Sequence, residues 1–270
     1  MAKRLMAIFD PYIAKVTEYI EEMKAKGKRF REIFCPTSVD GLLQGLPVRI
    51  GPNASSGLVL RSDTFVELGN PEAGSCAFLL WTDNPGLVKD GKITILGPDI
   101  PESYGASLPF GQVLLIGGVE LTQQDHTLLE RTQYVSDQIE GYMLRSVPQV
   151  IWSRVSKEAV SRGFCFETLG RALMAIFKSS ATKVQALEVL FVTSGRQDLH
   201  PLENIATQVR KIGRDIVREK WKAKGVDLIE CTLGWDCRSC PDKFVCDDIK
   251  EIIAIRKKEK EEQTDDGAAG

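Results

Sequence analysis

The stretch that decides the fold is DGKITILGPDIPESYGASLPFGQVLLIGG, residues 90–118. It contains the apolar run KITILG at 92–97, and a second run, GQVLLIGGVEL at 111–121, begins inside it. The residues between the two runs are rich in Gly, Pro, Asp and Ser, which break regular structure. Short apolar runs between breakers predict buried β-strands, because a buried strand has apolar neighbours on both faces. The centre of the chain is therefore predicted to be a sheet.

Other segments on either side of this centre extend the pattern. Two more apolar runs predict strands, at 76–82 and 184–194, and a weaker one predicts a strand at 226–231. Apolar residues at helical spacing predict helices at 9–23, 126–146, 155–162, 167–178 and 202–224. We interpret the basic run 24–31 as the solvated end of the first helix.

These elements predict an α/β fold, a mixed sheet flanked by helices. A helical N-terminal segment at 1–45 and a cysteine-rich metal loop near the C-terminus complete it. The expected organisation is 1–45 helical, 46–195 an α/β domain, 196–250 a long helix and a four-cysteine segment, and 251–270 a charged, frayed tail.

Composition excludes several classes of function. The 270 residues carry a formal net charge of -2, which gives no electrostatic case for nucleic acid or an acidic membrane as a partner. The sequence has no run of 18 apolar residues and no apolar core of a signal peptide near its start. A cytoplasmic location is expected, where thiols stay reduced and clustered cysteines more often hold metal than form disulfides.

Common catalytic motifs are also missing from the sequence. It contains no GxxxxGK[ST], no GxGxxG between a strand and a helix, and no GxSxG. The two histidines, His126 and His200, lie near predicted helix starts, where polar residues are common. A hydrolase or a dehydrogenase therefore has no support.

The stretch CTLGWDCRSCPDKFVC, residues 231–246, holds four of the seven cysteines. They are Cys231, Cys237, Cys240 and Cys246, spaced C-x5-C-x2-C-x5-C. Thiolates bind Zn²⁺ and iron–sulfur clusters. A zinc ribbon would show two C-x2-C pairs, whereas only one is present, so the spacing favours one loop around a [4Fe–4S] cluster. Structural zinc, another metal or no metal remain as alternatives.

The other three cysteines, Cys35, Cys76 and Cys165, are isolated in the sequence. Isolated cysteines most often behave as small buried hydrophobes. Each is therefore predicted to be a core residue rather than a ligand.

Residues 90–118, together with VIWSRVSKEAVSRGFCFETLGRALMAIF at 150–177, resemble the middle domain of acetyl-CoA synthase. That protein is the beta subunit of the carbon monoxide dehydrogenase/acetyl-CoA synthase complex. The resemblance implies the same α/β fold over about 46–195. It is carried by DGKI, GPDI, LPxG and WxRVSKxAVxxGFxF, which here are Asp90, Gly91, Lys92, Ile93, Gly97, Pro98, Asp99, Ile100, Leu108, Pro109, Gly111, Trp152, Arg154, Val155, Ser156, Lys157, Ala159, Val160, Gly163, Phe164 and Phe166.

The departures from the family pattern affect the expected function. In the family a later domain holds a [4Fe–4S] cluster bridged to two nickel ions, and the distal nickel needs Cys-x-Cys. This sequence has no Cys-x-Cys, so assembly of acetyl-CoA by this chain alone is not expected. The resemblance also implies a link with coenzyme A and with docking of the corrinoid protein. A second family Trp, nine residues before Trp152, is Met143 here, which weakens the link with coenzyme A.

The leading prediction is an iron–sulfur accessory protein of anaerobic one-carbon and corrinoid metabolism. It would dock a corrinoid protein or a subunit of the carbon monoxide dehydrogenase/acetyl-CoA synthase type, and pass electrons through the four-cysteine cluster. The alternatives are a docking module with a structural zinc site and an acyl or methyl transfer involving coenzyme A. Arg154 and Lys157 are candidates for binding an anion, with surface solvation as the alternative, and Trp152 is predicted to be core.

Overall fold

The computed structural model describes residues 8–222 except for 52–53, 55–57, 120–124, 126–127, 130–131, 133–137 and 148–149. The four clustered cysteines, the predicted strand at 226–231, His126 and the charged tail lie outside the described residues. The chain divides into two compact units, residues 1–210 and 211–270. The first unit contains both of the described β-sheets.

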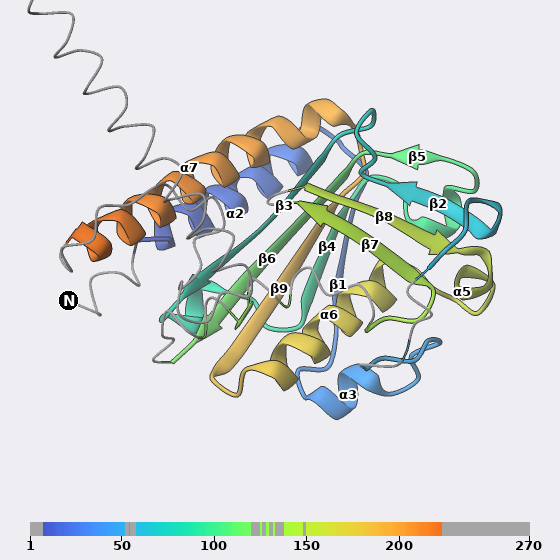
Figure 1. The fold of residues 1–270 in the computed structure, drawn as a ribbon, viewed down its shortest axis with the longest axis horizontal. Helices are drawn as coiled ribbons and strands as arrows, with labels where there is room; N and C mark the ends of the chain where they lie inside the picture. The colour runs from blue at the N-terminus through green and yellow to red at the C-terminus, as the bar shows by residue number, and fades with distance from the viewer. Residues whose placement is uncertain are drawn as a thin grey trace, which may run out of the picture. The chain divides into compact units, whose positions relative to one another are not determined.

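A five-stranded sheet forms the centre of this unit (Figure 1). Its order is β1 (Phe30–Phe34), β4 (Lys92–Leu96), β9 (Val184–Val192), β6 (Phe110–Gly118) and β3 (Ser75–Thr82). The pairs β4–β9 and β3–β6 are parallel, and the pairs β1–β4 and β6–β9 are antiparallel. The predicted mixed α/β sheet is confirmed, and the four apolar runs at 76–82, 92–97, 111–121 and 184–194 are the edge strand β3 and the three inner strands β4, β6 and β9, all of them largely buried.

Helices cover both faces of this sheet. On one face lies α6 (Phe166–Ser180), where a Cβ at Gly170 would lie 2.5 Å from the Ile93 side chain, so α6 approaches β4 closely. On the other face lie α2 (Asp10–Ala25) and the first half of α7 (Arg196–Lys222), which run alongside each other in Figure 1. The Tyr19 hydroxyl of α2 donates to the Asp198 carbonyl of α7 over 2.8 Å, which ties the two helices together.

A smaller four-stranded sheet packs against the start of β3. Ser75 joins the two sheets, because its hydroxyl donates to the carbonyl of Ile151 and accepts from the amide of the same residue, at 2.7 and 2.8 Å. The strand order is β5 (Ser107–Leu108), β2 (Thr64–Leu68), β8 (Val150–Ser156) and β7 (Tyr142–Val147).

Short helices connect these strands. They are α3 (Val39–Leu43), α5 (Lys157–Ser161) and the 3₁₀ turns η1 (Arg61–Asp63), η2 (Pro85–Leu87) and η3 (Ile100–Glu102).

The helix predicted over 126–146 is wrong at its C-terminal end. Residues 125, 128, 129 and 132 are helical, but Tyr142–Val147 is the strand β7. Gly141 has φ +74°, a left-handed conformation that interrupts a helix and suits glycine. The segment after it pairs with β8 along its whole length, so sheet pairing outweighs the helical spacing of its apolar residues.

Three other boundaries differ from the sequence predictions. The basic run 24–31 is not one solvated helix end, because α2 ends at Ala25 and β1 begins at Phe30. The helix predicted at 155–162 begins only at Lys157, where the Ser156 side chain caps it. The last helix begins at Arg196 instead of 202, so Pro201 lies inside its first turns.

Candidate functional site

The predicted metal ligands, Cys231, Cys237, Cys240 and Cys246, lie outside the described residues, so their geometry remains a prediction. Within the described part of the chain, no group of three or more His, Cys, Asp or Glu side chains could hold a metal ion. No helix there is long and apolar enough to cross a membrane.

The three isolated cysteines are free thiols. Cys76 is a buried residue of β3, as predicted, and burial raises the pKa of its thiol to about 12. Cys35 and Cys165 are only partly buried. Burial also raises the pKa of the Cys35 thiol.

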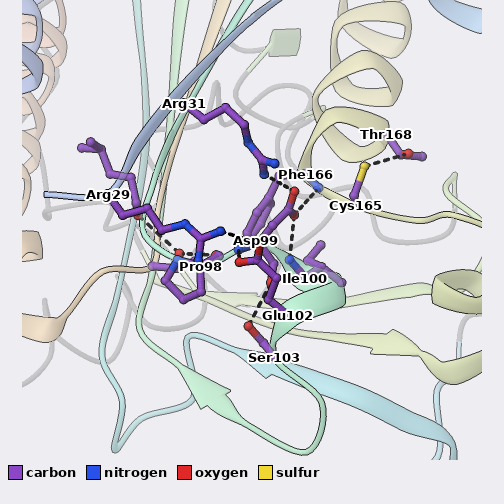
Figure 2. Close-up of polar contacts among 12 residues, drawn as sticks. Arg29, Arg31, Pro98, Asp99, Ile100, Glu102, Ser103, Cys165, Phe166 and Thr168 are labelled. Atoms are coloured by element: carbon purple, nitrogen blue, oxygen red, sulfur yellow. Dashed lines mark hydrogen bonds and ion pairs between the residues drawn. The ribbon is translucent and has the colours of Figure 1, made fainter.

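The most organised polar cluster surrounds Asp99 of the GPDI motif, at the carboxyl end of β4. Its side chain is buried, and one carboxylate oxygen accepts the amide hydrogens of Ile100 at 2.6 Å and Phe166 at 2.9 Å. The other oxygen pairs with the guanidinium of Arg31 from β1. Figure 2 shows these groups meeting at the first residue of α6. The carboxylate therefore satisfies amides at two helical starts, η3 and α6, and balances one cation.

Neighbouring groups hold the Asp99 backbone in place. The carboxylate of Glu102 accepts the Asp99 amide hydrogen at 3.0 Å, and the Ser103 hydroxyl donates to the Asp99 carbonyl at 2.9 Å. At Gly97, with φ +109°, an added Cβ would lie 2.4 Å from the backbone nitrogen of Ser194. Glycine is therefore required where the β4 and β9 ends pass each other.

Basic residues of the α2–β1 connection run along this edge, and we name residues 28–31 the basic strap. Each basic side chain pairs with an acid that follows one of the parallel strands β4 and β9. The pairs are Lys28 with Asp198, Arg29 with Glu102 and Arg31 with Asp99. In open α/β sheets the crevice at the carboxyl ends of the strands is the usual ligand site. Here the ion pairs of the chain itself occupy that edge.

The DGKI motif also makes internal contacts. The Asp90 carboxylate accepts the amide hydrogen of Leu187 at 2.9 Å and pairs with Lys178 of α6 at 2.8 Å. Lys92 is 4% exposed and lies between two carboxylates, 2.7 Å from Glu32 and 3.3 Å from Glu188. Burial alone would raise the pKa of Glu32, but the ammonium groups of Lys92 and Lys24 together outweigh burial and lower that pKa. The motif joins β1, β4, β9 and α6.

The predicted anion-binding residues of the WSRVSK motif have partners within the chain. Arg154 Nε lies 2.7 Å from the Glu67 carboxylate across the small sheet. Lys157 Nζ donates to the Ser62 carbonyl at 2.9 Å. Ser156 caps α5 by accepting the Ala159 amide hydrogen at 3.1 Å.

One face of the small sheet gathers an aromatic ring and two guanidinium groups. The Arg154 and Arg145 carbons lie 5.2 and 5.7 Å from the Trp152 ring centroid, within cation–π distance. Met143 is the cross-strand partner of Arg154 on this face. Trp152 is half-buried rather than core, and its buried indole N–H has no hydrogen-bond acceptor among the described residues.

A sequence model of the family described as the CO dehydrogenase/acetyl-CoA synthase complex beta subunit matches residues 46–197, which include all of these motifs. The chain belongs to this family. Three of its relatives are subunits of the acetyl-CoA decarbonylase/synthase complex. They are subunit beta 2 of Methanosarcina acetivorans, 31% identical over 205 residues; subunit beta 1 of Methanosarcina thermophila, 29% identical over 204; and subunit beta of Methanopyrus kandleri, 28% identical over 210.

The alignments with these beta subunits cover 74–76% of the chain but only 42–43% of each relative. This member of the beta-subunit family therefore spans less than half the length of the curated relatives it matches.

Sequence reasoning missed two features of this beta-subunit domain. The basic strap appeared only as a charge run, because its acidic partners lie about 70 or more residues further along the chain. Arg145 was missed because its segment was predicted to be helical. Met143 and Arg145 are two residues apart, so in a strand their side chains lie on the same face of the sheet. That spacing was the signal that could have identified Arg145.

Proposed function

We propose that this chain is an iron–sulfur accessory subunit of anaerobic one-carbon metabolism that works beside a carbon monoxide dehydrogenase/acetyl-CoA synthase type of complex. Its family domain docks a corrinoid protein or another subunit of such a complex. Cys231, Cys237, Cys240 and Cys246 hold a [4Fe–4S] cluster that passes electrons to the docked partner, for example to reactivate an oxidised corrinoid.

One observation carries this proposal. A beta-subunit domain is followed by four cysteines with the spacing C-x5-C-x2-C-x5-C, in a sequence without the Cys-x-Cys that the distal nickel needs. All four thiolates are needed for a single cluster, so none is left to bridge to nickel. The carboxylates of Asp90 and Asp99 both make hydrogen bonds and ion pairs within the chain. Their role is therefore structural, which supports docking in preference to catalysis by these two motif residues.

The test is to purify the full chain without oxygen and to measure iron, acid-labile sulfide, zinc and nickel per chain. About four iron and four sulfide, with a spectrum that bleaches on reduction by dithionite, support the proposal. One zinc without sulfide contradicts it, and leaves the alternative of a docking module with a structural metal. The same protein is then mixed with a purified corrinoid protein to follow cob(II)alamin reduction.

A second candidate function is acyl or methyl transfer involving coenzyme A. The face of the small sheet that carries Trp152 favours it. An indole ring beside the guanidinium groups of Arg145 and Arg154 suits a purine ring that carries phosphates. Titration of the protein with coenzyme A should then quench tryptophan fluorescence, and the Trp152→Phe variant should lose that response. Absence of binding at millimolar coenzyme A rules this candidate out.

A further inference from the structure

Two neighbouring rows of side chains cross one face of the small sheet. In the first row Arg154 of β8 lies opposite Met143 of β7 and Glu67 of β2. In the second row Trp152 of β8 lies opposite Arg145 of β7. Residues directly opposite each other in antiparallel strands share a face, and so do residues two apart in one strand. The rows therefore bring one ring, two guanidinium groups and one carboxylate together, and we name Arg145, Trp152, Arg154 and Glu67 the Trp152 face.

Glu67 holds Arg154 by one edge of its guanidinium group. The Glu67 carboxylate accepts the Nε hydrogen of Arg154 at 2.7 Å, and the two side chains are only 23% and 17% exposed. The guanidinium carbon of Arg154 lies 5.2 Å from the Trp152 ring centroid. No other acceptor within the described residues binds this guanidinium, so its two terminal nitrogens remain available to an anion.

Arg145 supplies a second cation next to the same ring. Its side chain is exposed, and its guanidinium carbon lies 5.7 Å from the Trp152 centroid. In the described part of the chain no carboxylate pairs with Arg145. The two rows therefore carry more positive than negative charge, which suits an anionic group bound beside the ring.

The Glu67 carboxylate has two opposite effects on such a ligand. Its charge repels an anion, but water and salt weaken this repulsion at a partly exposed site. Its hydrogen bond holds a long and flexible side chain in one orientation before the ligand arrives. Ordering that side chain during binding would otherwise weaken affinity by roughly two- to tenfold. We therefore expect the gain from orientation to exceed the loss from repulsion.

We propose that Glu67 is a positioning residue of the Trp152 face: it orients the terminal nitrogens of Arg154 for a phosphate group of the ligand without binding that ligand itself. This inference rests on the second candidate function, in which coenzyme A is the ligand, and it adds the residue that prepares the site.

The experiment measures the Kd of coenzyme A by isothermal titration calorimetry, with the full chain purified without oxygen. The variants are Glu67→Ala, Glu67→Gln, Arg154→Ala and the double variant Glu67→Ala/Arg154→Ala. Glu158→Ala is the matched control, because it also removes one carboxylate, but from α5, where the Glu158 side chain is 79% exposed and pairs with Arg162. Circular dichroism checks that every variant is folded at the temperature of the titration.

The expected result for Glu67→Ala is binding weakened about fivefold or more, although this variant removes a negative charge beside an anion. Glu67→Gln should bind at least as tightly as the unaltered chain, because its amide oxygen still accepts the Nε hydrogen and no longer repels the ligand. In the Arg154→Ala background, Glu67→Ala should cause no further weakening, since Glu67 acts through Arg154. Glu158→Ala should leave the Kd unchanged.

Two results would overturn the positioning role and leave coenzyme A as a candidate ligand. One is a Glu67→Ala variant that binds coenzyme A as tightly as the unaltered chain or more tightly, as charge alone predicts. The other is further weakening by Glu67→Ala when Arg154 is already alanine. Absence of binding by the unaltered chain at millimolar coenzyme A overturns both the positioning role and the second candidate function. The iron–sulfur proposal is tested separately by metal content.

Discussion

Arg31 and Asp99 form an ion pair that fixes the first strand of the main sheet to the start of α6. The pair has this effect because the Asp99 carboxylate also accepts the Phe166 amide hydrogen. One buried carboxylate therefore connects β1, the loop after β4 and α6. In this chain the GPDI motif of the family holds these elements together, at the edge of the sheet where α/β proteins usually bind ligands.

Substitution of Asp99 should destabilise the fold. We expect Asp99→Ala to lower the free energy of unfolding by about 2–4 kcal/mol, because it leaves buried amides without an acceptor and Arg31 without its carboxylate. Glu102→Gln is the control: it retains an oxygen for the Asp99 amide and loses only a surface ion pair, so it should cost about 1 kcal/mol or less. Urea unfolding followed by circular dichroism measures both, and equal losses would contradict this account.

The buried Lys92 gives a second prediction. Lys92→Met should cost about 3–5 kcal/mol of unfolding free energy, because Glu188 is then left buried with an uncompensated charge. Lys24→Met is the control. Lys24 pairs with Glu32, which is the other carboxylate beside Lys92, but Lys24 is 28% exposed, so its loss should cost about 1 kcal/mol or less. The double variant Lys92→Met/Glu188→Met should recover part of the loss; if it is less stable than Lys92→Met alone, the buried charge is not the cause.

The stability of the protein in acid should depend on Glu140. Hydrogen bonds from Arg49, together with Arg162, lower the pKa of Glu140 from 4.5 to about 2. A depressed folded-state pKa stabilises the protein above pH 4.5, and this stabilisation is lost as the pH falls towards 2. The stability difference between the unaltered chain and Glu140→Gln should therefore be constant above pH 5 and shrink between pH 4.5 and 2. A difference that is flat across that interval would show that Glu140 is not responsible.

The link between the two sheets should depend on one hydroxyl. Ser75→Ala removes both hydrogen bonds to Ile151 and should cost about 1–3 kcal/mol. The Ile151 amide should also exchange its hydrogen faster in deuterated water. Ser62→Ala, at an exposed serine, should change stability by no more than about 0.5 kcal/mol.

The proposed cluster predicts which cysteines matter. Cys240→Ser should remove most of the iron from protein purified without oxygen, whereas Cys165→Ser should leave about four iron per chain. Iron analysis and the visible absorption spectrum measure both variants. Retention of iron in Cys240→Ser would exclude Cys240 as a ligand.

Much of the fold could be predicted from local patterns. The apolar runs behind β3, β4, β6 and β9 identify these strands because strands that are covered on both sides of the sheet are apolar on both faces. The spacing of Ile13, Val16, Ile20 and Met23 identifies α2 because one helix face packs on the sheet. The family motifs and the four-cysteine spacing are equally visible in the sequence. The strands β1, β2 and β8 were harder to find, since their mixed polar and apolar residues carry a weaker signal.

The sequence by itself determined the class of fold, the family and the candidate metal ligands, because each depends on residues close together along the chain. Only the tertiary structure decided that Tyr142–Val147 is a strand, and that the basic strap pairs with the acids at the carboxyl edge of the sheet. Those features depend on pairing between residues far apart in sequence. Such pairing is selected by the burial and charge balance of the whole fold, and local spacing does not contain it.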